Sequence, residues 1–102
     1  MLIYTDENNF EKAIMQKEVC LVDFFATWCG PCRMLNEELI KLDKEQSALI
    51  IKVDIDECPN LAEQFNIDVV PTMFVLKNGK PVQQLQGYVK ANHLAEVLKQ
   101  YE

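Results

Sequence analysis

The sequence predicts a single α/β domain over residues 1–102, with a central mixed sheet of five strands flanked by four helices. Strand-like and helix-like segments alternate along the chain, which is typical of parallel strands joined by crossover helices on both faces. Near the carboxyl end, two strand-like runs are joined by KNGK, where Asn78-Gly79 indicates a tight hairpin between antiparallel strands. A length of 102 residues with 49% hydrophobic residues suits one compact core.

The chain begins with a short strand at Met1–Tyr4, followed by a helix between Thr5 and Lys17. Within that helix, Asn8 and Glu11 have the spacing of a capping box, with Asn in place of Ser or Thr. The apolar residues that recur at helical spacing are Phe10, Ala13 and Ile14.

The middle of the chain predicts two buried strands, each followed by a helix. Val19–Ala26 is apolar at nearly every position, as expected for a central strand covered on both faces. Ala48–Val53 has the same character, and Pro59–Phe65 follows it as a short helix. Between these strands a long amphipathic helix runs to about Gln46, with an apolar face formed by Leu35, Leu39 and Leu42.

The last part of the chain predicts the hairpin and a final helix. Thr72–Leu76 and Pro81–Gln86 are its strands. The helix that follows carries one apolar stripe at i, i+3, i+4 and i+7, formed by Leu94, Val97, Leu98 and Tyr101.

The charge balance excludes several kinds of partner. The formal net charge is -6, from 10 basic and 16 acidic residues, so no basic surface is expected to attract nucleic acid. No apolar run approaches the roughly 20 residues of a membrane span, and the first residues do not resemble a secretory signal peptide. We therefore expect a cytoplasmic protein.

Two of the four cysteines lie outside any obvious motif. Cys20 falls in the apolar run VCLVDFFA and Cys58 in the turn-like ECPN. Two structural disulfides would be typical of a secreted scaffold without a core, but this chain has enough apolar residues to build one. We therefore expect a reducing compartment, and we interpret Cys20 and Cys58 as structural or incidental.

The other two cysteines form a C-x-x-C motif in ATWCGPCR, between a buried strand and a helix. Unpaired amides and the positive end of the helix dipole would stabilise a thiolate at Cys29, which is therefore the predicted nucleophile. Cys32 lies one turn further along, where it could attack a mixed disulfide formed at Cys29. Pro31 suits the first turn of a helix because its missing amide would be unpaired there anyway.

Three other interpretations of the motif stay open at this point. A zinc site would need two further ligands, and the only histidine, His93, lies far along the chain. A purely structural disulfide would stabilise little, because the loop it closes is very short. A chance C-x-x-C is the third.

The residues also resemble a known family. VDFFATWCGPCR, followed in order by KVDIDE, VVPT, FVLKNGK and QGY, resembles the thioredoxin family over essentially the whole chain. The resemblance implies a thioredoxin fold and a general protein-disulfide reductant that works by dithiol/disulfide exchange. It further implies that no cofactor is bound, that disulfide-containing proteins are the substrates, and that an NADPH-dependent thioredoxin reductase restores the dithiol; we expect a monomer.

Asp23 and Lys52 are two charged residues in otherwise apolar strands. Burial should raise the pKa of the Asp23 carboxyl toward a range that is useful for proton transfer. Opposite charges in neighbouring buried strands are expected to meet, so Lys52 is the predicted partner of Asp23. By resemblance, Asp23 is the family's buried aspartate that takes the proton of the second cysteine, and Lys52 is the lysine near it.

The resemblance also implies a substrate-binding surface around Cys29. Family members keep a cis-proline, here Pro71, and pair an extended substrate with the backbone of the residue before it, here Val70. Such strand addition gives affinity without demanding one side chain. The expected binding residues are Trp28, Gly30, Pro31, Val70, Pro71 and Gly87.

Three positions depart from the family, and two alternative functions stay open independently of them. Phe25 and Glu37 stand where many members have a second tryptophan and a helix-bending proline, and Lys90 stands where a capping residue would open the last helix, a loss of about 1 kcal/mol. One alternative is a thioredoxin-fold oxidase or isomerase. The other is a docking subunit in which the cysteine pair is secondary.

Overall fold

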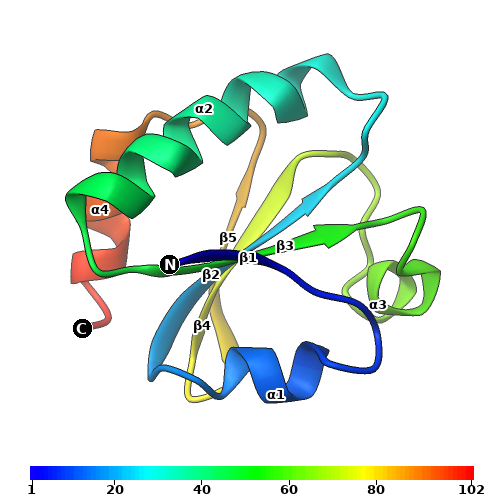
Figure 1. Cartoon of the computed structure of the whole chain (residues 1–102), viewed down its shortest axis with the longest axis horizontal. Coiled ribbons are helices and arrows are strands. Elements are labelled where there is room, and N and C mark those ends of the chain that lie inside the picture. The colour runs from blue at the N-terminus through cyan, green and yellow to red at the C-terminus, as the bar shows by residue number, and fades with distance from the viewer.

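A computed structural model describes all residues of the chain, 1–102. Its core is one five-stranded sheet in the order β1-β3-β2-β4-β5 (Figure 1). The strands are β1 (Leu2–Tyr4), β2 (Val19–Phe25), β3 (Leu49–Asp54), β4 (Thr72–Lys77) and β5 (Lys80–Gln86). The helices are α1 (Phe10–Ile14), α2 (Gly30–Glu45), α3 (Pro59–Gln64) and α4 (Ala91–Lys99).

The predicted mixed sheet is confirmed. β1, β3 and β2 run parallel to one another, whereas β4 is antiparallel to both β2 and β5. The last two strands are joined at Asn78 and Gly79, whose φ angles of 52° and 80° give the left-handed turn that such a hairpin requires. None of the helices has the length and apolar character that crossing a membrane would require.

The two faces of the sheet are covered by different helices. Because side chains alternate along a strand, Cys20, Val22 and Phe24 of β2 pack on one face with residues of α1 and α3. Leu21 packs on the opposite face with the leucines of α2 and α4. Figure 1 shows α2 and α4 together on one side of the sheet and α1 and α3 on the other. The amphipathic patterns read from the sequence therefore correspond to these two cores.

The first helix is shorter than predicted, and the capping box is wrong. α1 begins only at Phe10, and its N-cap residue Asn9 makes no side-chain capping bond. Instead, Asp6 Oδ1 accepts hydrogen bonds from the backbone and side-chain nitrogens of Asn9, at 2.9 and 2.8 Å. This local bond holds the polar stretch before Phe10 in turns, because Asp and Asn side chains compete with helical hydrogen bonding.

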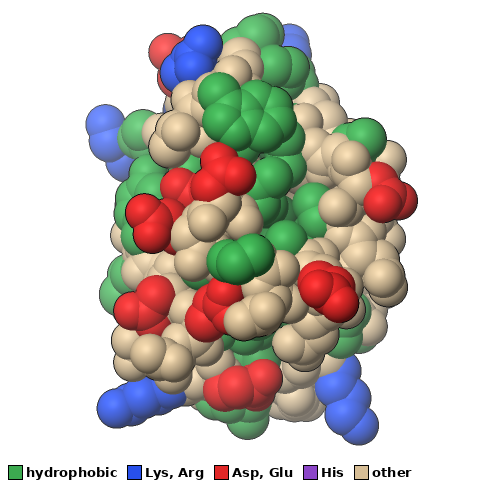
Figure 2. All heavy atoms as spheres, turned by 90° about the vertical axis from the view of Figure 1, so that its right-hand side faces the viewer, with side chains coloured by type: hydrophobic (Ala, Val, Ile, Leu, Met, Phe, Trp, Pro, Cys, Tyr) green, Lys and Arg blue, Asp and Glu red, His purple; other side chains and the backbone are tan.

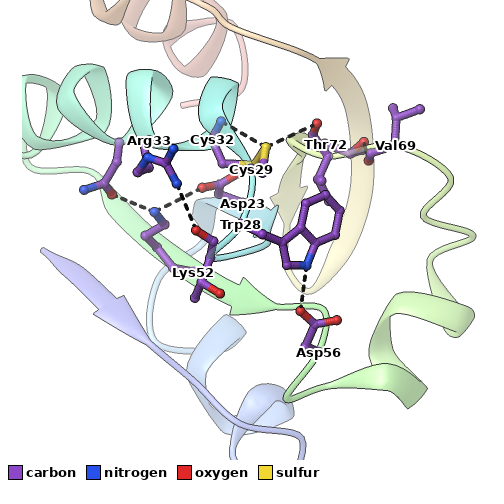
Figure 3. Close-up of a disulfide and its surroundings, with 12 residues drawn as sticks. Asp23, Trp28, Cys29, Cys32, Arg33, Lys52, Asp56, Val69 and Thr72 are labelled. Carbon is purple, nitrogen blue, oxygen red and sulfur yellow. Dashed lines mark hydrogen bonds and ion pairs between the residues drawn. A yellow bond between two sulfur atoms is a disulfide. The ribbon is translucent and has the colours of Figure 1, made fainter.

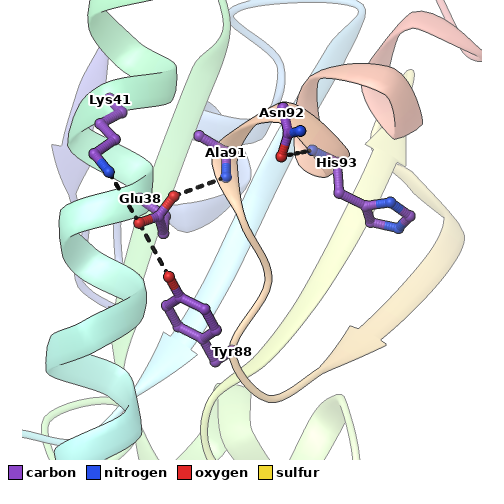
Figure 4. Close-up of polar contacts among 6 residues, drawn as sticks. All are labelled: Glu38, Lys41, Tyr88, Ala91, Asn92 and His93. Carbon is purple, nitrogen blue, oxygen red and sulfur yellow. Dashed lines mark hydrogen bonds and ion pairs between the residues drawn. The ribbon is translucent and has the colours of Figure 1, made fainter.

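The start of α4 is stabilised by a residue from another helix. Lys90 makes no side-chain capping bond, as the sequence predicted, but Glu38 Oε1 of α2 accepts a 3.0 Å hydrogen bond from Ala91 N. The other Glu38 oxygen accepts from Tyr88 Oη at 3.1 Å and lies 3.3 Å from Lys41 Nζ (Figure 4). Glu38 thus replaces the missing cap, and the cost expected from Lys90 alone is offset by a tertiary contact.

Candidate active site

The two motif cysteines lie where β2 ends and α2 begins. The chain leaves β2 at Phe25, and α2 starts at Gly30. Cys29 is the N-cap of α2 and Cys32 lies in its first turn. Their Cα atoms are 5.3 Å apart and their sulfurs form a disulfide. The helix therefore presents both sulfurs at the carboxyl edge of the sheet, where open α/β sheets carry their chemistry.

Hydrogen bonding distinguishes the two sulfurs, whereas burial does not. Both residues are almost fully buried, with 4% of Cys29 and 2% of Cys32 exposed. Cys29 Sγ accepts a 3.1 Å hydrogen bond from Cys32 N, one of the amides that a helix start leaves without an internal partner. A negative charge on Cys29 Sγ would be stabilised by this amide and by the helix dipole.

A loop before β4 faces the disulfide. Val70 O lies 3.7 Å from Cys29 Sγ, and the Val70–Pro71 peptide bond is cis. The loop is fixed by two hydrogen bonds, from Thr72 Oγ1 to Val69 O at 2.7 Å and from Gly87 N to Pro71 O at 2.9 Å. The structure therefore brings Val70 to Cys29, with Pro71 next to it in the chain and Gly87 bonded to Pro71.

Trp28 forms an exposed rim beside the disulfide. Its side chain is 66% exposed, so it is not an ordinary packing residue. Its indole Nε1 donates a 3.0 Å hydrogen bond to Asp56 Oδ2, which orients the ring at the edge of the site (Figure 3). Pro31 is also exposed, and Gly30 is half-buried with open space beside it. The sequence interpretation missed Asp56, although KVDIDE includes the end of strand β3 and Asp56 comes two residues after that end.

Asp23 and Lys52 meet beneath the disulfide. They are directly opposite in the parallel register of β2 and β3, on the face that α2 covers. Asp23 Oδ2 lies 3.5 Å from Lys52 Nζ, and the two residues are 0% and 3% exposed. Burial raises the pKa of the Asp23 carboxyl to about 6, with Lys52 opposing part of this rise. Burial also lowers the pKa of the Lys52 ammonium, and the Asp23 charge opposes that change.

The Lys52 ammonium has a defined environment of its own. Asn36 Oδ1 accepts a 2.6 Å hydrogen bond from Lys52 Nζ. The ammonium also lies 4.4 Å from the ring centre of Phe25 and 5.6 Å from that of Tyr4, within reach of a cation–π attraction. A hollow of about 390 Å³ opens here, and Cys32 and Lys52 are among the residues that line it. Sequence reasoning missed Asn36, although its position four residues after Cys32 places it on the same helix face.

The remaining cysteines, Cys20 and Cys58, are buried thiols whose pKa is raised. Cys20 is 1% exposed, and burial raises the pKa of its thiol to about 11. Cys58 is fully buried; burial and, next, the carboxylate of Glu7 raise its pKa. Neither residue is paired in a disulfide. No group of three or more His, Cys, Asp or Glu side chains is arranged to hold a metal ion.

The side of the molecule at which α3 lies is rich in negative charge. Figure 2 shows apolar side chains running down this side, flanked by several acidic ones, with Lys and Arg only at the margins of the view. The acidic residues near Cys58 are Asp6, Glu7, Asp54 and Glu57, and Asp56 lies beside Trp28. A partner that approaches from this side meets apolar surface bordered by carboxylates.

Comparisons with known proteins agree with this geometry. The thioredoxin family model matches residues 1–100. A thioredoxin of Staphylococcus haemolyticus is 41% identical across 98% of this chain and 97% of its own length. Thioredoxin 2 of Chlorobaculum tepidum is 41% identical across 95% of this chain and 91% of its own.

Solved structures of similar proteins have the same fold. A mutant thioredoxin from Halobacterium salinarum has a TM-score of 0.92 at 29% identity, covering 98% of this chain and 89% of that one. A chloroplastic thioredoxin z has a TM-score of 0.88 at 32% identity, covering 98% of this chain and 93% of that one.

Proposed function

The chain belongs to the thioredoxin family and is a protein-disulfide oxidoreductase; we propose that it is a general reductant of protein disulfides, with Cys29 as the nucleophile and Cys32 as the resolving thiol. The observation that carries this assignment is the 3.1 Å hydrogen bond from Cys32 N to Cys29 Sγ at the start of α2. In the reduced protein, this amide would stabilise a thiolate at Cys29 and not at Cys32, which separates the roles of the two cysteines.

The first step is attack of the Cys29 thiolate on one sulfur of a substrate disulfide. The substrate S–S bond breaks, a mixed disulfide forms between Cys29 and the substrate, and the other substrate sulfur leaves as a thiolate that takes up a proton. In the second step, the Cys32 thiol gives up its proton and attacks Cys29 Sγ. The mixed disulfide breaks, the second substrate sulfur leaves and is protonated, and the Cys29–Cys32 disulfide remains. Two electrons have then passed from the protein to the substrate.

Asp23 is the proposed acceptor of the Cys32 proton. Its carboxyl is fully buried on the α2 side of the sheet, and its pKa of about 6 suits a group that takes and returns protons near neutral pH. Lys52 is its charge partner at 3.5 Å.

The loop that faces Cys29 is proposed to bind the substrate backbone. Val70 is followed by the cis bond to Pro71, and its carbonyl lies 3.7 Å from Cys29 Sγ. An extended substrate segment would pair with this backbone while its side chains contact the exposed Trp28 and Pro31 and the half-buried Gly30 and Gly87. This mode of binding supports a broad range of protein substrates.

Regeneration requires a second protein. Thioredoxins are reduced by a thioredoxin reductase, and we propose an NADPH-dependent flavoprotein reductase as the partner of this chain, which would act as a monomer with no bound cofactor. Because the two other cysteines, Cys20 and Cys58, are buried thiols that stay unpaired, we also propose the cytoplasm as its compartment.

Trapping the mixed disulfide tests the assignment. A Cys32→Ser variant should accumulate a covalent complex with a disulfide-bonded protein substrate, identified by mass spectrometry at Cys29. A Cys29→Ser variant is the matched control and should accumulate none. Trapping through Cys32 in that control would reverse the two roles.

The reduction potential tests the direction of the reaction. Equilibration with glutathione should give a potential well below the cytosolic poise of roughly -220 to -260 mV. A potential well above it would favour an oxidase or isomerase instead. Full biological activity of a Cys29→Ser, Cys32→Ser double variant would favour a docking subunit.

A further inference from the structure

The side chain of Asn36 contacts the site but has no part in the steps proposed above. It lies on α2 one turn after Cys32, so both residues share the helix face that covers the sheet. Its Oδ1 accepts a 2.6 Å hydrogen bond from Lys52 Nζ, whereas Lys52 Nζ is 3.5 Å from Asp23 Oδ2. The ammonium is therefore shared unequally, with the shorter contact to a neutral amide and the longer one to a carboxylate.

This arrangement leaves the Asp23 carboxylate without a hydrogen bond. Neither of its oxygens accepts one from any protein group. A buried carboxylate without a donor is costly, and the flexible stem of a lysine would allow Lys52 to approach it. The other close contacts of the ammonium are the hydrogen bond to Asn36 and the ring of Phe25, whose centre is 4.4 Å away.

We propose that Asn36 is a positioning residue, which holds the Lys52 ammonium away from Asp23 and thereby keeps both carboxylate oxygens free to take and return a proton. The proposal rests on the proton-transfer role assigned to Asp23 above. An ammonium closer than the observed 3.5 Å would favour the charged carboxylate more strongly and make it a weaker proton acceptor.

Few other charged or titratable groups face this pair. From α2, Cys32 belongs to the disulfide, and the exposed Arg33 donates to Thr27 O at 3.1 Å. From β1, Tyr4 contributes its ring at 5.6 Å from Lys52 Nζ. From β4, the residue in register with Asp23 is the uncharged Met73. An Asn36 substitution would therefore act on Asp23 through the position of one charge, the Lys52 ammonium.

The first test measures the pKa of the Asp23 carboxyl directly, by carbon-13 NMR titration of the oxidised protein without substrate. In Asn36→Ala, Lys52 should close on Asp23, and the shorter distance should lower the carboxyl pKa by roughly one unit at an effective dielectric constant of about 20. Asn36→Asp keeps an acceptor for Lys52 and should not lower it. Met34→Ala, an exposed change on the same helix, is the matched control. An unchanged or higher pKa in Asn36→Ala would overturn the proposal.

The second test follows resolution of a mixed disulfide between Cys29 and a chromophoric small-molecule disulfide over a range of pH. In Asn36→Ala, the midpoint of the rate profile should move to lower pH by the same amount as the NMR pKa, and Asn36→Asp should not reproduce this move. A lowered NMR pKa with an unchanged profile would support the positioning by Asn36 and overturn the role of Asp23 in proton transfer. An unchanged NMR pKa with normal trapping at Cys29 would overturn the positioning and leave the proposed function standing.

Discussion

Replacing Asp23 by Asn should change how the stability of the protein depends on pH. The carboxyl is fully buried, and burial raises its pKa from 3.8 to about 6. Below pH 3.8 it is protonated in both the folded and the unfolded protein. Between these two values the folded protein keeps a proton that the unfolded chain has released, so the stability that this proton contributes falls as pH rises and is lost above about pH 6.

The size of this effect follows from the pKa difference. A shift of one unit corresponds to about 1.4 kcal/mol, so a rise of about two units corresponds to about 3 kcal/mol of unfolding free energy lost between acid and neutral pH. In Asp23→Asn the side chain is an amide, which stays uncharged throughout this range of pH. The unfolding free energy of the variant minus that of the wild type should therefore rise by about 3 kcal/mol as the pH is raised from about 3.5 to about 7.5.

Urea unfolding of the oxidised protein, followed by far-ultraviolet circular dichroism over this range of pH, measures the difference. The contributions of the other carboxylates cancel when the variant is compared with the wild type at each pH. Asp68→Asn removes one exposed carboxylate and is the control for the change in net charge. A stability difference between Asp23→Asn and wild type that stays constant with pH would refute the reasoning.

Three further predictions concern the supporting structure. The largest cause of the lowered pKa of the Glu38 carboxyl is the hydrogen bond from Ala91 N, so the charged carboxylate stabilises the fold at neutral pH and this stabilisation is lost as pH falls through the lowered pKa. The melting temperature of Glu38→Gln should therefore lie below that of the wild type at neutral pH. A difference in melting temperature that does not narrow in acid would contradict this. Leu39→Ala should cost about 2 to 5 kcal/mol in urea unfolding because the side chain is 0% exposed, whereas the adjacent Ile40→Ala, at 43% exposed, should cost less than about 1 kcal/mol; equal costs would count against the assigned core. Gly79→Ala should cost about 1 kcal/mol or more, since φ is +80° and the added Cβ would lie 3.0 Å from Met15 Sδ, and an unchanged urea midpoint would rule this strain out.

The elements with a strong pattern could be predicted from the sequence. Strands β2 and β3 are almost continuously apolar because both faces are covered, and Asn78-Gly79 marks the turn between β4 and β5. The limits of these four strands differ from the predicted ones by at most one residue. The first helix could not be placed as well. Its helical spacing extends over few residues, and the hydrogen bonds of Asp6 hold the preceding segment in a turn.

In the site, the residues that the sequence identified are those with a local signal. Cys29 and Cys32 form a motif, and Asp23 and Lys52 are charges in apolar strands. Glu38 has no such signal: it looks like one of many surface glutamates on a helix, and its role as a cap depends on how α2 and α4 pack. Contacts of this kind join residues far apart in the chain, so no local pattern predicts them.

Trp28 gives the protein an optical probe at a useful place. It is the only tryptophan, it is 66% exposed in the folded protein, and it neighbours the disulfide. Because the indole is already in contact with water, unfolding should change its emission little, whereas cleavage of the adjacent disulfide should remove a nearby quencher. Tryptophan emission should therefore follow the redox state of the protein in solution, whereas it should change little when the protein unfolds.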